Sequence, residues 1–432
     1  MPLFELKGSE NYATIIEIYD TSKEVPLRGR DRIIGYRTQG GQAIIGKNQY
    51  ANSDLIIVFP AECQLSDVYA RANNLYRHSN LNADSTKSGY LEDSRRVKAL
   101  KMGEHHSTML IMPLRSLTAG ITGNYEQTMR EVKPGLIFDY YNGQEICRKY
   151  VIEYEQFGNK NTISKTASRK YGPQLGARDF PLHFDTTNGW RNLHRLNPDD
   201  MVWLSQKLHG SSVRAGNIMV DRDLNWWQRI AAKLGLIKRT EYRTVVGSRT
   251  VIKGFNGQPA NSRDWWTPAV AHMLPTIPPG YMMYGEIIGW TPSGAPIQKD
   301  YTYQIPKGEN RVYVYRVTRR DSLNWVDLTW PEIEQFCASR DWNVVPSLTT
   351  EPLKMREAQH LIDNLVLGNK RYRDEGYQQA LPLAPGLPDE GIVVRRDNYQ
   401  QTPLVLKFKS PAFLTHETIS LDSGQADYES VA

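Results

Sequence analysis

The chain contains 432 residues, enough for two or three domains with sizeable hydrophobic cores, which excludes a disulfide-held miniprotein or a single small binding module. Charged residues make up 23% of the sequence, and no stretch approaches the roughly 18 consecutive apolar residues of a membrane span. The net charge of +6 is compatible with a polyanionic partner but does not by itself identify one.

The number of cysteines and the first residues of the chain indicate the cellular compartment. Cys63, Cys147 and Cys337 are too few for a disulfide framework, and no Cys and His spacing resembles a zinc site. The first residues show no basic start followed by an apolar stretch, so we expect no secretory signal. These features predict an intracellular, cytoplasmic protein without a membrane partner, and they leave its oligomeric state open.

The first part of the chain reads as short β-rich runs bounded by Gly, Asn, Asp or Pro, at residues 13–19, 32–36, 43–45, 55–59, 96–100 and 107–114. This pattern predicts a small antiparallel barrel over residues 1–120, with the size and texture of an oligonucleotide-binding (OB) barrel. Residues 41–47 match the first seven positions of a phosphate-binding P-loop. However, Asn48 replaces the Ser or Thr that binds magnesium, so we interpret this stretch as a barrel hairpin.

Residues 121–180 mix charges, glycines and aromatics with weak periodicity, and we interpret them as a linker or flanking segment. Strand-like runs follow at 201–204, 281–289, 311–317, 391–395 and 404–408. Thr329 and Glu332 form a capping box that opens one helix, and a second helix over 354–367 ends at Gly368. The sequence therefore predicts that residues 181–432 form an α+β domain with a mostly antiparallel sheet.

Four short segments carry the chemistry of this second domain. They read KLHG at 207–210, YGEIIG at 284–289, DEGIVVR at 389–395 and LKFK at 406–409. Each is weak alone, but together and in this order they resemble the nucleotidyl motifs of the covalent nucleotidyltransferases, which are the DNA ligases, RNA ligases and mRNA capping enzymes. The resemblance implies an ATP-grasp-like nucleotidyltransferase (adenylation) domain with antiparallel sheets at 181–432, and a covalent lysyl-AMP formed from ATP.

Lys207 is the nucleophile in this resemblance. A free lysine has a pKa of about 10.4 and is almost wholly protonated at neutral pH, so something must lower its pKa before it attacks the α-phosphate. Lys407 and Lys409 lie two residues apart on a predicted strand and share a face, so they can supply neighbouring cations. They would also neutralise charge that develops on the phosphate. The alternative is a charge pair exposed on an edge strand.

Glu286 and Glu390 each stand beside a glycine next to a β-rich run, so both carboxylates can face one pocket. The resemblance places Glu286 near the ribose hydroxyls and Glu390 at a hydrated divalent cation, with both as candidate metal ligands and Gly210 among the nucleotide-binding residues. Magnesium, or manganese in its place, suits such a site because magnesium keeps several waters and takes one or two carboxylates. Either glutamate alone could equally be a solvated strand end.

Two further positions match the family. Arg249, after the apolar pair Val245 and Val246, corresponds to a basic motif that contacts phosphate or the incoming strand. Tyr315 stands where an aromatic ring stacks on the purine. Tyr313 shares its face by strand alternation, so it remains a candidate, and either tyrosine could instead belong to the core.

The branch of the superfamily follows from details of the motifs. His209 and Ser212 fill positions where DNA ligases and capping enzymes usually carry Asp and Arg, and this pattern resembles RNA ligases. Segments 54–60, 73–77 and 89–99 resemble the N-terminal OB domain of the Deinococcus-type RNA ligases. The resemblance covers roughly 1–115 and 180–415. Gln206 departs from it, since relatives often carry Glu there, and residues 120–180 have no counterpart.

The resemblance implies an ATP-dependent RNA ligase that transfers AMP from Lys207 to a 5′-phosphate and seals it to a 3′-hydroxyl, at nicks or bridged breaks in RNA or RNA-containing duplexes, as in RNA repair. Four basic residues of the first domain are predicted to grip backbone phosphates, although they could also form a solvated strand face: Arg95, Arg96, Lys98 and Lys101. The alternatives are a nucleic-acid-binding protein with an inactive ligase domain, a DNA ligase and a capping guanylyltransferase.

Overall fold

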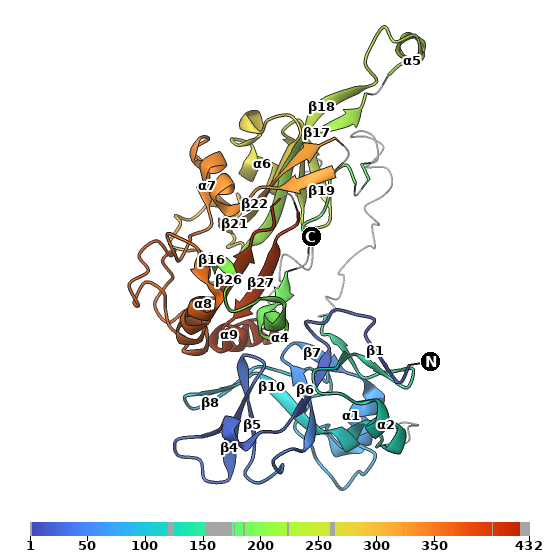
Figure 1. The fold of residues 1–432 in the computed structure, drawn as a ribbon, viewed down its shortest axis with the longest axis vertical. Coiled ribbons are helices and arrows are strands. Elements are labelled where there is room, and N and C mark those ends of the chain that lie inside the picture. Colours follow the sequence, from blue (N-terminus) through green and yellow to red (C-terminus); the bar gives the residue numbers. More distant parts are fainter. Residues whose placement is uncertain are drawn as a thin grey trace.

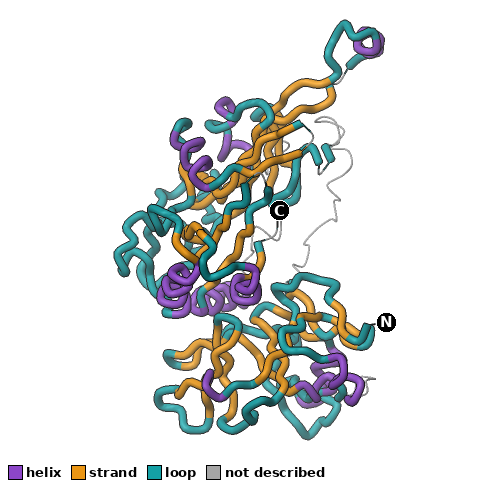
Figure 2. Tube along the Cα trace, viewed as in Figure 1, coloured by secondary structure: helices purple, strands orange, loops and turns teal. Residues whose placement is uncertain are grey.

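The computed structural model describes residues 2–119, 125–151, 175–176, 178–184, 186–222, 224–259, 264–322, 324–399 and 401–423. The N-terminal part holds several small sheets and the C-terminal part holds two larger ones. Figures 1 and 2 show the two parts one below the other, with helix α9 (Pro411–Asp422) at their junction. The mixed α+β fold with antiparallel sheets confirms the predicted fold class at this level.

Strand β6, with the sequence LIIVFP, organises the N-terminal part. Its alternate side chains enter two separate cores, Ile57 and Phe59 one and Ile56 and Val58 the other, and all four are fully buried. The sheet around it has the order β10 (Met109–Pro113), β6 (Leu55–Pro60), β2 (Thr14–Ile18), β11 (Ile137–Phe138). Both faces of this sheet are therefore covered.

The other N-terminal sheets are small. They comprise β3 (Glu24–Pro26), β4 (Ile33–Thr38) and β5 (Gly41–Gly46); β1 (Phe4–Glu5), β12 (Tyr140–Tyr141) and β13 (Gln144–Glu145); β7 (Cys63–Leu65) and β14 (Cys147–Lys149); and β8 (Leu100–Met102) with β9 (His105–Ser107). Two helices, α1 (Asp67–Ala72) and α2 (Tyr125–Glu131), flank them. The P-loop-like stretch is strand β5 paired with β4, as the hairpin interpretation requires.

Strand pairings among residues 2–119 and 125–151 do not close into a barrel, so the OB-type barrel stays a prediction. Residues 125–149, whose elements the sequence pattern does not place, supply β11, β12 and β14 to sheets begun by β2, β1 and β7. Of the predicted linker segment, residues 121–124, 152–174 and 177 lie outside the described residues, as does residue 120 at the end of the first predicted domain.

The C-terminal part begins with a five-stranded sheet, in which only the β15–β27 pair is parallel. Its order is β15 (Thr187–Asn188), β27 (Leu404–Lys409), β26 (Gly391–Arg396), β16 (Met201–Lys207), β25 (Leu353–Lys354). Helix α8 (Met355–Ile362) continues as a turn of π-helix over Asp363–Leu367 and ends at Gly368. It buries Ala358, Ile362 and Leu365 in the core that it shares with this sheet. These observations confirm the predicted helix and its apolar face. The short helix α4 (Gly189–Asn192) follows β15.

The second sheet is long and antiparallel along its main path, β20 (Gln258–Pro259), β19 (Ile252–Phe255), β18 (Thr240–Ser248), β17 (Ser211–Asp221), β21 (Tyr281–Gly289), β22 (Asn310–Asp321), β23 (Asn324–Asp327), with β24 (Asn343–Val344) parallel to β22. Helices α6 (Trp266–Val270) and α7 (Trp330–Ala338) contribute buried residues to its core. The capping box of Thr329 and Glu332 opens α7 as predicted. The β17–β18 hairpin extends beyond the body and carries α5 (Trp226–Lys233) at its end (Figure 1).

All three cysteines are buried and unpaired. None of the helices in the described ranges is long and apolar enough to cross a membrane.

Candidate active site

A cavity of about 260 Å³ lies where strands of the two C-terminal sheets meet. Residues from all four sequence motifs line it, together with side chains that no motif indicated. Of the predicted site residues, the following line this cavity: Lys207, Gly210, Arg249, Glu286, Tyr315, Glu390, Lys407 and Lys409. Lys207 and Lys409, 202 residues apart in the sequence, and the motif residues between them therefore converge on one space, as the motif analysis expects. The individual roles of these residues stay predictions.

Lys207 and Glu390 form the centre of the cavity. Lys207 is the last residue of β16 and pairs with Gly391, the first residue of β26, so the register brings Glu390 beside the lysine. Lys207 Nζ lies 2.7 Å from Glu390 Oε1, and the carboxylate side chain is only 2% exposed. Gly391 is required here because a Cβ would lie 1.9 Å from the carbonyl oxygen of Phe408 on the neighbouring strand.

The electrostatics of Glu390 depend on three cationic or titratable neighbours. Lys207, Lys409 and His209 approach its carboxylate at 2.7, 3.6 and 3.8 Å. Burial alone would raise the pKa of Glu390, but these neighbours outweigh burial and hold the pKa below its usual value. The His209 side chain is 22% exposed, and its partial burial lowers its pKa. Glu390 is thus a buried anion that organises the end of β16.

Lys407 and Lys409 share one face of β27 and both reach the cavity, but their environments differ. Glu417 on α9 lies 3.0 Å from Lys409 Nζ. Although burial opposes it, the carboxylates of Glu417 and Glu390 raise the pKa of Lys409 above its usual value. Lys407 has burial and the cations Lys409 and Lys207 around it, and these lower its pKa to about 8.

This lowered pKa of Lys407 makes the stability of the protein depend on pH. Between about pH 8 and the unfolded-state pKa near 10.4, Lys407 binds more protons in the unfolded chain than in the folded one. Its contribution to the free energy of unfolding therefore rises with pH over this range. We expect Lys407→Met to raise the thermal unfolding midpoint at pH 7 and to lose this advantage progressively as the pH approaches about 10. Circular dichroism melts of both proteins at four pH values measure the difference. A pH-independent difference would contradict the assignment.

Glu286, on β21, binds the loop that follows Lys207 (residues 208–210). Its Oε1 accepts a hydrogen bond from the Gly210 N–H at 3.0 Å. Gly210 has no room for a side chain, because a Cβ would lie 2.3 Å from the carbonyl oxygen of Ile287. The loop also receives the Gln298 side chain, whose Nε2 donates to the Gly210 carbonyl at 2.9 Å. Glu286 therefore faces the same cavity as Lys207 and helps to fix the loop that follows it.

The two tyrosines of β22 are distinguished by a β-bulge. Strand pairing runs from Tyr284 with Arg316 to Gly285 with Val314, so Tyr315 has no partner on β21. The bulge breaks strict alternation: Tyr313 is buried in the core, whereas Tyr315 lines the cavity. Of the two candidates, the structure therefore places Tyr315 in the cavity.

Several cavity residues carry no sequence signal. Glu417 lies beyond the last motif, and its role emerges only from the return of α9 over β27. Tyr12 and Lys149 reach the cavity from the N-terminal part, although they are far from the motifs in sequence. His183 is half-buried beside Tyr315, with ring centroids 5.0 Å apart. Desolvation, together with nearby arginines, lowers its pKa to about 3.

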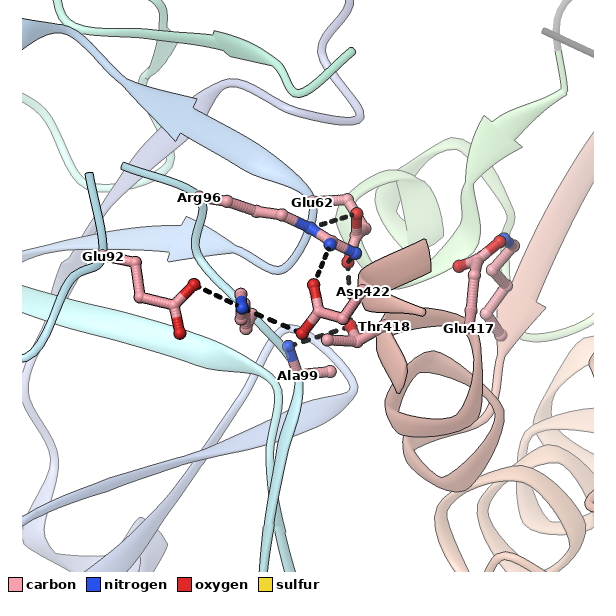
Figure 3. Close-up of polar contacts among 9 residues, drawn as sticks. Glu62, Glu92, Arg96, Ala99, Glu417, Thr418 and Asp422 are labelled. Carbon is pink, nitrogen blue, oxygen red and sulfur yellow. Dashed lines mark hydrogen bonds and ion pairs between the residues drawn. The ribbon is translucent and has the colours of Figure 1, made fainter. Parts of the chain in front are cut away.

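Two of the predicted phosphate-binding residues instead join the N-terminal part to α9 (Figure 3). Arg96 is 3% exposed and places its guanidinium 2.7 Å from Glu62 and 2.9 Å from Asp422. Lys98 contacts Asp422 at 2.8 Å and Glu92 at 2.6 Å. These charges face carboxylates in this conformation. The pair with Glu62 is buried within the N-terminal part, whereas the pair with Asp422, whose side chain is 40% exposed, is the one that crosses to α9.

Hydroxyl groups of α9 complete this junction, which we call the α9 clamp (Glu62, Arg96, Lys98, Thr418 and Asp422). Thr418 donates to Glu62 at 2.9 Å and accepts from the Ala99 N–H at 3.2 Å. His106 contacts Thr415 at 2.8 Å one turn earlier. The helix that holds Lys409 through Glu417 is therefore also the helix on which the N-terminal part rests.

The other two predicted residues differ. Arg95 is half-buried and donates to the Leu65 carbonyl and the Tyr76 hydroxyl. Lys101 is exposed on β8. Of the four residues, Lys101 thus presents the most accessible cation.

Comparison with known proteins gives a family match over part of the second half of the chain. Residues 200–409 match the family model described as RNA ligase. The fold is similar to that of an RNA ligase from Naegleria gruberi with pyrophosphate, with a TM-score of 0.54, 15% identity, and 94% of this chain and 98% of that chain covered. A mutant of that ligase with ATP and manganese gives a TM-score of 0.54, 15% identity and 93% and 98% coverage. The comparison with curated proteins finds no match.

Proposed function

Since residues 200–409 match the RNA ligase family model, we propose that this chain is an ATP-dependent RNA ligase that works through a lysyl-AMP intermediate. The observation that carries the proposal is the cluster of Lys207, Glu390, Lys407 and Lys409 within one cavity that also contains Glu286 and Tyr315. Naegleria gruberi RNA ligase, which has a similar fold over nearly its whole length, has been solved with ATP and manganese and with AMP and manganese.

In the proposed reaction, the neutral amine of Lys207 attacks the α-phosphorus of ATP. An N–P bond forms, the bond to the β-phosphate oxygen breaks, and pyrophosphate leaves with the negative charge. A 5′-phosphate of RNA then displaces the lysine and takes the AMP, and a 3′-hydroxyl attacks that 5′-phosphate and releases AMP. Lys407 and Lys409 are assigned to the phosphate charge, because both reach the cavity beside Lys207.

The remaining predicted residues keep their proposed roles. Tyr315 stacks on the adenine, Glu286 and Gly210 hold the ribose end, and Arg249 contacts phosphate. The cavity position of Tyr315 and the hydrogen bond between Gly210 and Glu286 support these assignments. The nucleophile must still lose a proton, and its closest carboxylate, Glu390, orients the amine at 2.7 Å.

The residues present fit a divalent cation. Glu390 Oε2 is buried, and no described residue donates a hydrogen bond to it, so this oxygen can accept a hydrogen bond from a metal-bound water. Magnesium and manganese are commonly held by one or two carboxylates together with phosphates and waters. We assign this role to Glu390 and Glu286. The metal would stabilise negative charge on the phosphates.

For the domains, we propose an RNA-binding N-terminal unit of OB type at about residues 1–120 and an adenylation unit over 181–432. The pairing of β11, β12 and β14 with N-terminal strands supports counting residues 125–149 with the first unit. The intracellular location, the Deinococcus-type subgroup, and phosphate contacts by Arg95, Arg96, Lys98 and Lys101 stay proposals. For Arg96 and Lys98, such contacts require the α9 clamp to open.

The test is to incubate the protein with magnesium and ATP or GTP labelled at the α-phosphate, followed by a denaturing gel. We expect label on the protein from ATP only. Nicked duplexes with RNA or DNA on the 3′-hydroxyl side then identify the strand, and we expect faster sealing with RNA. Label from GTP would assign the chain to the capping enzymes, equal sealing of DNA would favour a DNA ligase, and no label with any metal would leave a binding protein on a ligase fold.

A further inference from the structure

We propose that the end of the β17–β18 hairpin, here called the hairpin tip (residues 224–239), is an RNA-binding element that grips the substrate at a distance from the nick. This inference rests on the proposed ligase function and goes beyond it, because the tip lies outside the catalytic cavity and contains none of its motifs. In Figure 1 the hairpin carries α5 away from the rest of the molecule.

The first observation is an exposed aromatic and apolar surface. Trp226 and Trp227 are 59% and 64% exposed, and their rings stack on each other with centroids 3.5 Å apart. Leu234 and Leu236 are 69% and 73% exposed. A globular protein rarely leaves several large apolar side chains together in water without a partner. Exposed tryptophan faces are platforms on which nucleotide bases stack regardless of sequence.

The second observation is the charge of the tip. Between residues 226 and 239 the sequence has four basic residues and no acidic one. All four are exposed. Lys233, Lys238 and Arg239 each lack an ion pair with any carboxylate of the described residues. Arg229 donates to the Leu224 carbonyl at 2.9 Å and remains exposed. Cations next to stacking rings complement a polynucleotide, which offers phosphates and bases together.

The third observation is the rigid connection between the tip and the cavity. Strands β17 and β18 pair continuously from Val213 with Ser248, which line the cavity, to Asp221 with Thr240 at the base of the tip. Eight steps of about 3.3 Å give a span of roughly 26 Å. This span corresponds to roughly eight to ten base-pair steps of duplex RNA, whose A-form rise is shorter than the roughly 3.4 Å of B-DNA. The tip can therefore contact only substrates that extend this far from the nick.

The span makes the proposal testable by RNA length. Trp226→Ala combined with Trp227→Ala is expected to weaken binding of the long duplex, a nicked RNA duplex with eight base pairs and a 12-nucleotide single-stranded tail on each side, by about tenfold. The unpaired bases of the tail are free to stack on the tryptophan rings, and tenfold matches the loss of one such contact. A nicked duplex with five base pairs on each side should bind with less than a twofold change. Fluorescence anisotropy of end-labelled duplexes gives both dissociation constants.

A charge variant and a matched control sharpen the test. Lys233→Gln combined with Lys238→Gln should lower the slope of log affinity against log salt by about two for the long duplex only. Tyr399, another exposed aromatic residue (79%), lies outside the tip, and Tyr399→Ala should bind both duplexes as the wild type does.

Two readouts separate this inference from the proposed function. Lysine adenylylation by ATP without RNA should be unchanged in every tip variant; if the wild type forms no adenylate, the proposed function fails instead. Wild-type affinity of both tip variants for the long duplex would overturn the inference. If the tip variants instead lose binding to phosphatidylserine vesicles, or lose self-association in sedimentation, while RNA affinity is unchanged, the surface belongs to a membrane or to a second copy.

Discussion

Replacing Lys207 with arginine is expected to abolish formation of the labelled protein from ATP. The guanidinium keeps a positive charge beside the buried Glu390, which lies 2.7 Å from the lysine amine, so the carboxylate retains a partner. Arginine cannot supply a free electron pair at neutral pH, because its pKa exceeds about 12. The substitution therefore removes the nucleophile and preserves the charge. Single-turnover labelling with α-labelled ATP measures the loss.

A control for Lys207→Arg uses RNA that already carries AMP on its 5′-phosphate. Joining this RNA to a 3′-hydroxyl needs no attack by the lysine, so the variant should still seal it at a measurable rate. Failure in both assays would indicate a damaged fold. Labelling at the wild-type rate would show that another residue is the nucleophile, with Lys407, whose pKa is lowered to about 8, as the first candidate.

Replacing Glu390 with glutamine is expected to have the second largest effect. The amide has the same size, but it leaves Lys207 and His209 without their buried counter-charge, and it removes the orienting contact to the amine. Loss of one member of a buried ion pair costs roughly 3–5 kcal/mol. We expect destabilisation of about this size in urea unfolding. Separately, loss of the contact that orients the Lys207 amine should lower the labelling rate by roughly a hundredfold.

Asp200→Asn is the matched control for Glu390→Gln. Asp200 accepts a hydrogen bond from Arg396 at 2.8 Å on the same sheet, but it is more exposed and does not line the cavity. Its loss should cost about 1 kcal/mol or less and leave labelling unchanged. A labelling rate for Glu390→Gln within threefold of the wild type would remove Glu390 from the proposed machinery.

The sequence predicted the secondary structure of the second half well, because its signals are local. A capping box at Thr329 and the apolar face ending at Leu365 each depend on a few neighbouring residues, and both appear in α7 and α8. The convergence of the motifs was also predictable. Short motifs of a mostly antiparallel domain lie at strand ends, as Lys207 does on β16 and Lys409 does on β27.

Features that depend on long-range geometry could not be predicted. The cavity position of Tyr315, in contrast to the buried Tyr313, follows from a bulge in the pairing of β22 with β21, which no periodicity in the sequence reveals. The environment of Arg96 depends on Asp422, which lies more than 300 residues away. A basic residue on a predicted strand looks the same in sequence whether it faces solvent or a distant carboxylate.

The α9 clamp also links the stabilities of the two halves. Helix α9 follows directly from β27, so melting the five-stranded sheet withdraws Asp422 and Thr418 and leaves the buried Arg96 with one carboxylate fewer. Detachment of the N-terminal part, in turn, exposes Thr415 and Thr418, the buried side of the helix that positions Glu417 against Lys409. Unfolding of either half therefore removes contacts that stabilise the folded state of the other. The two halves, although separate in sequence, are expected to unfold more cooperatively on heating.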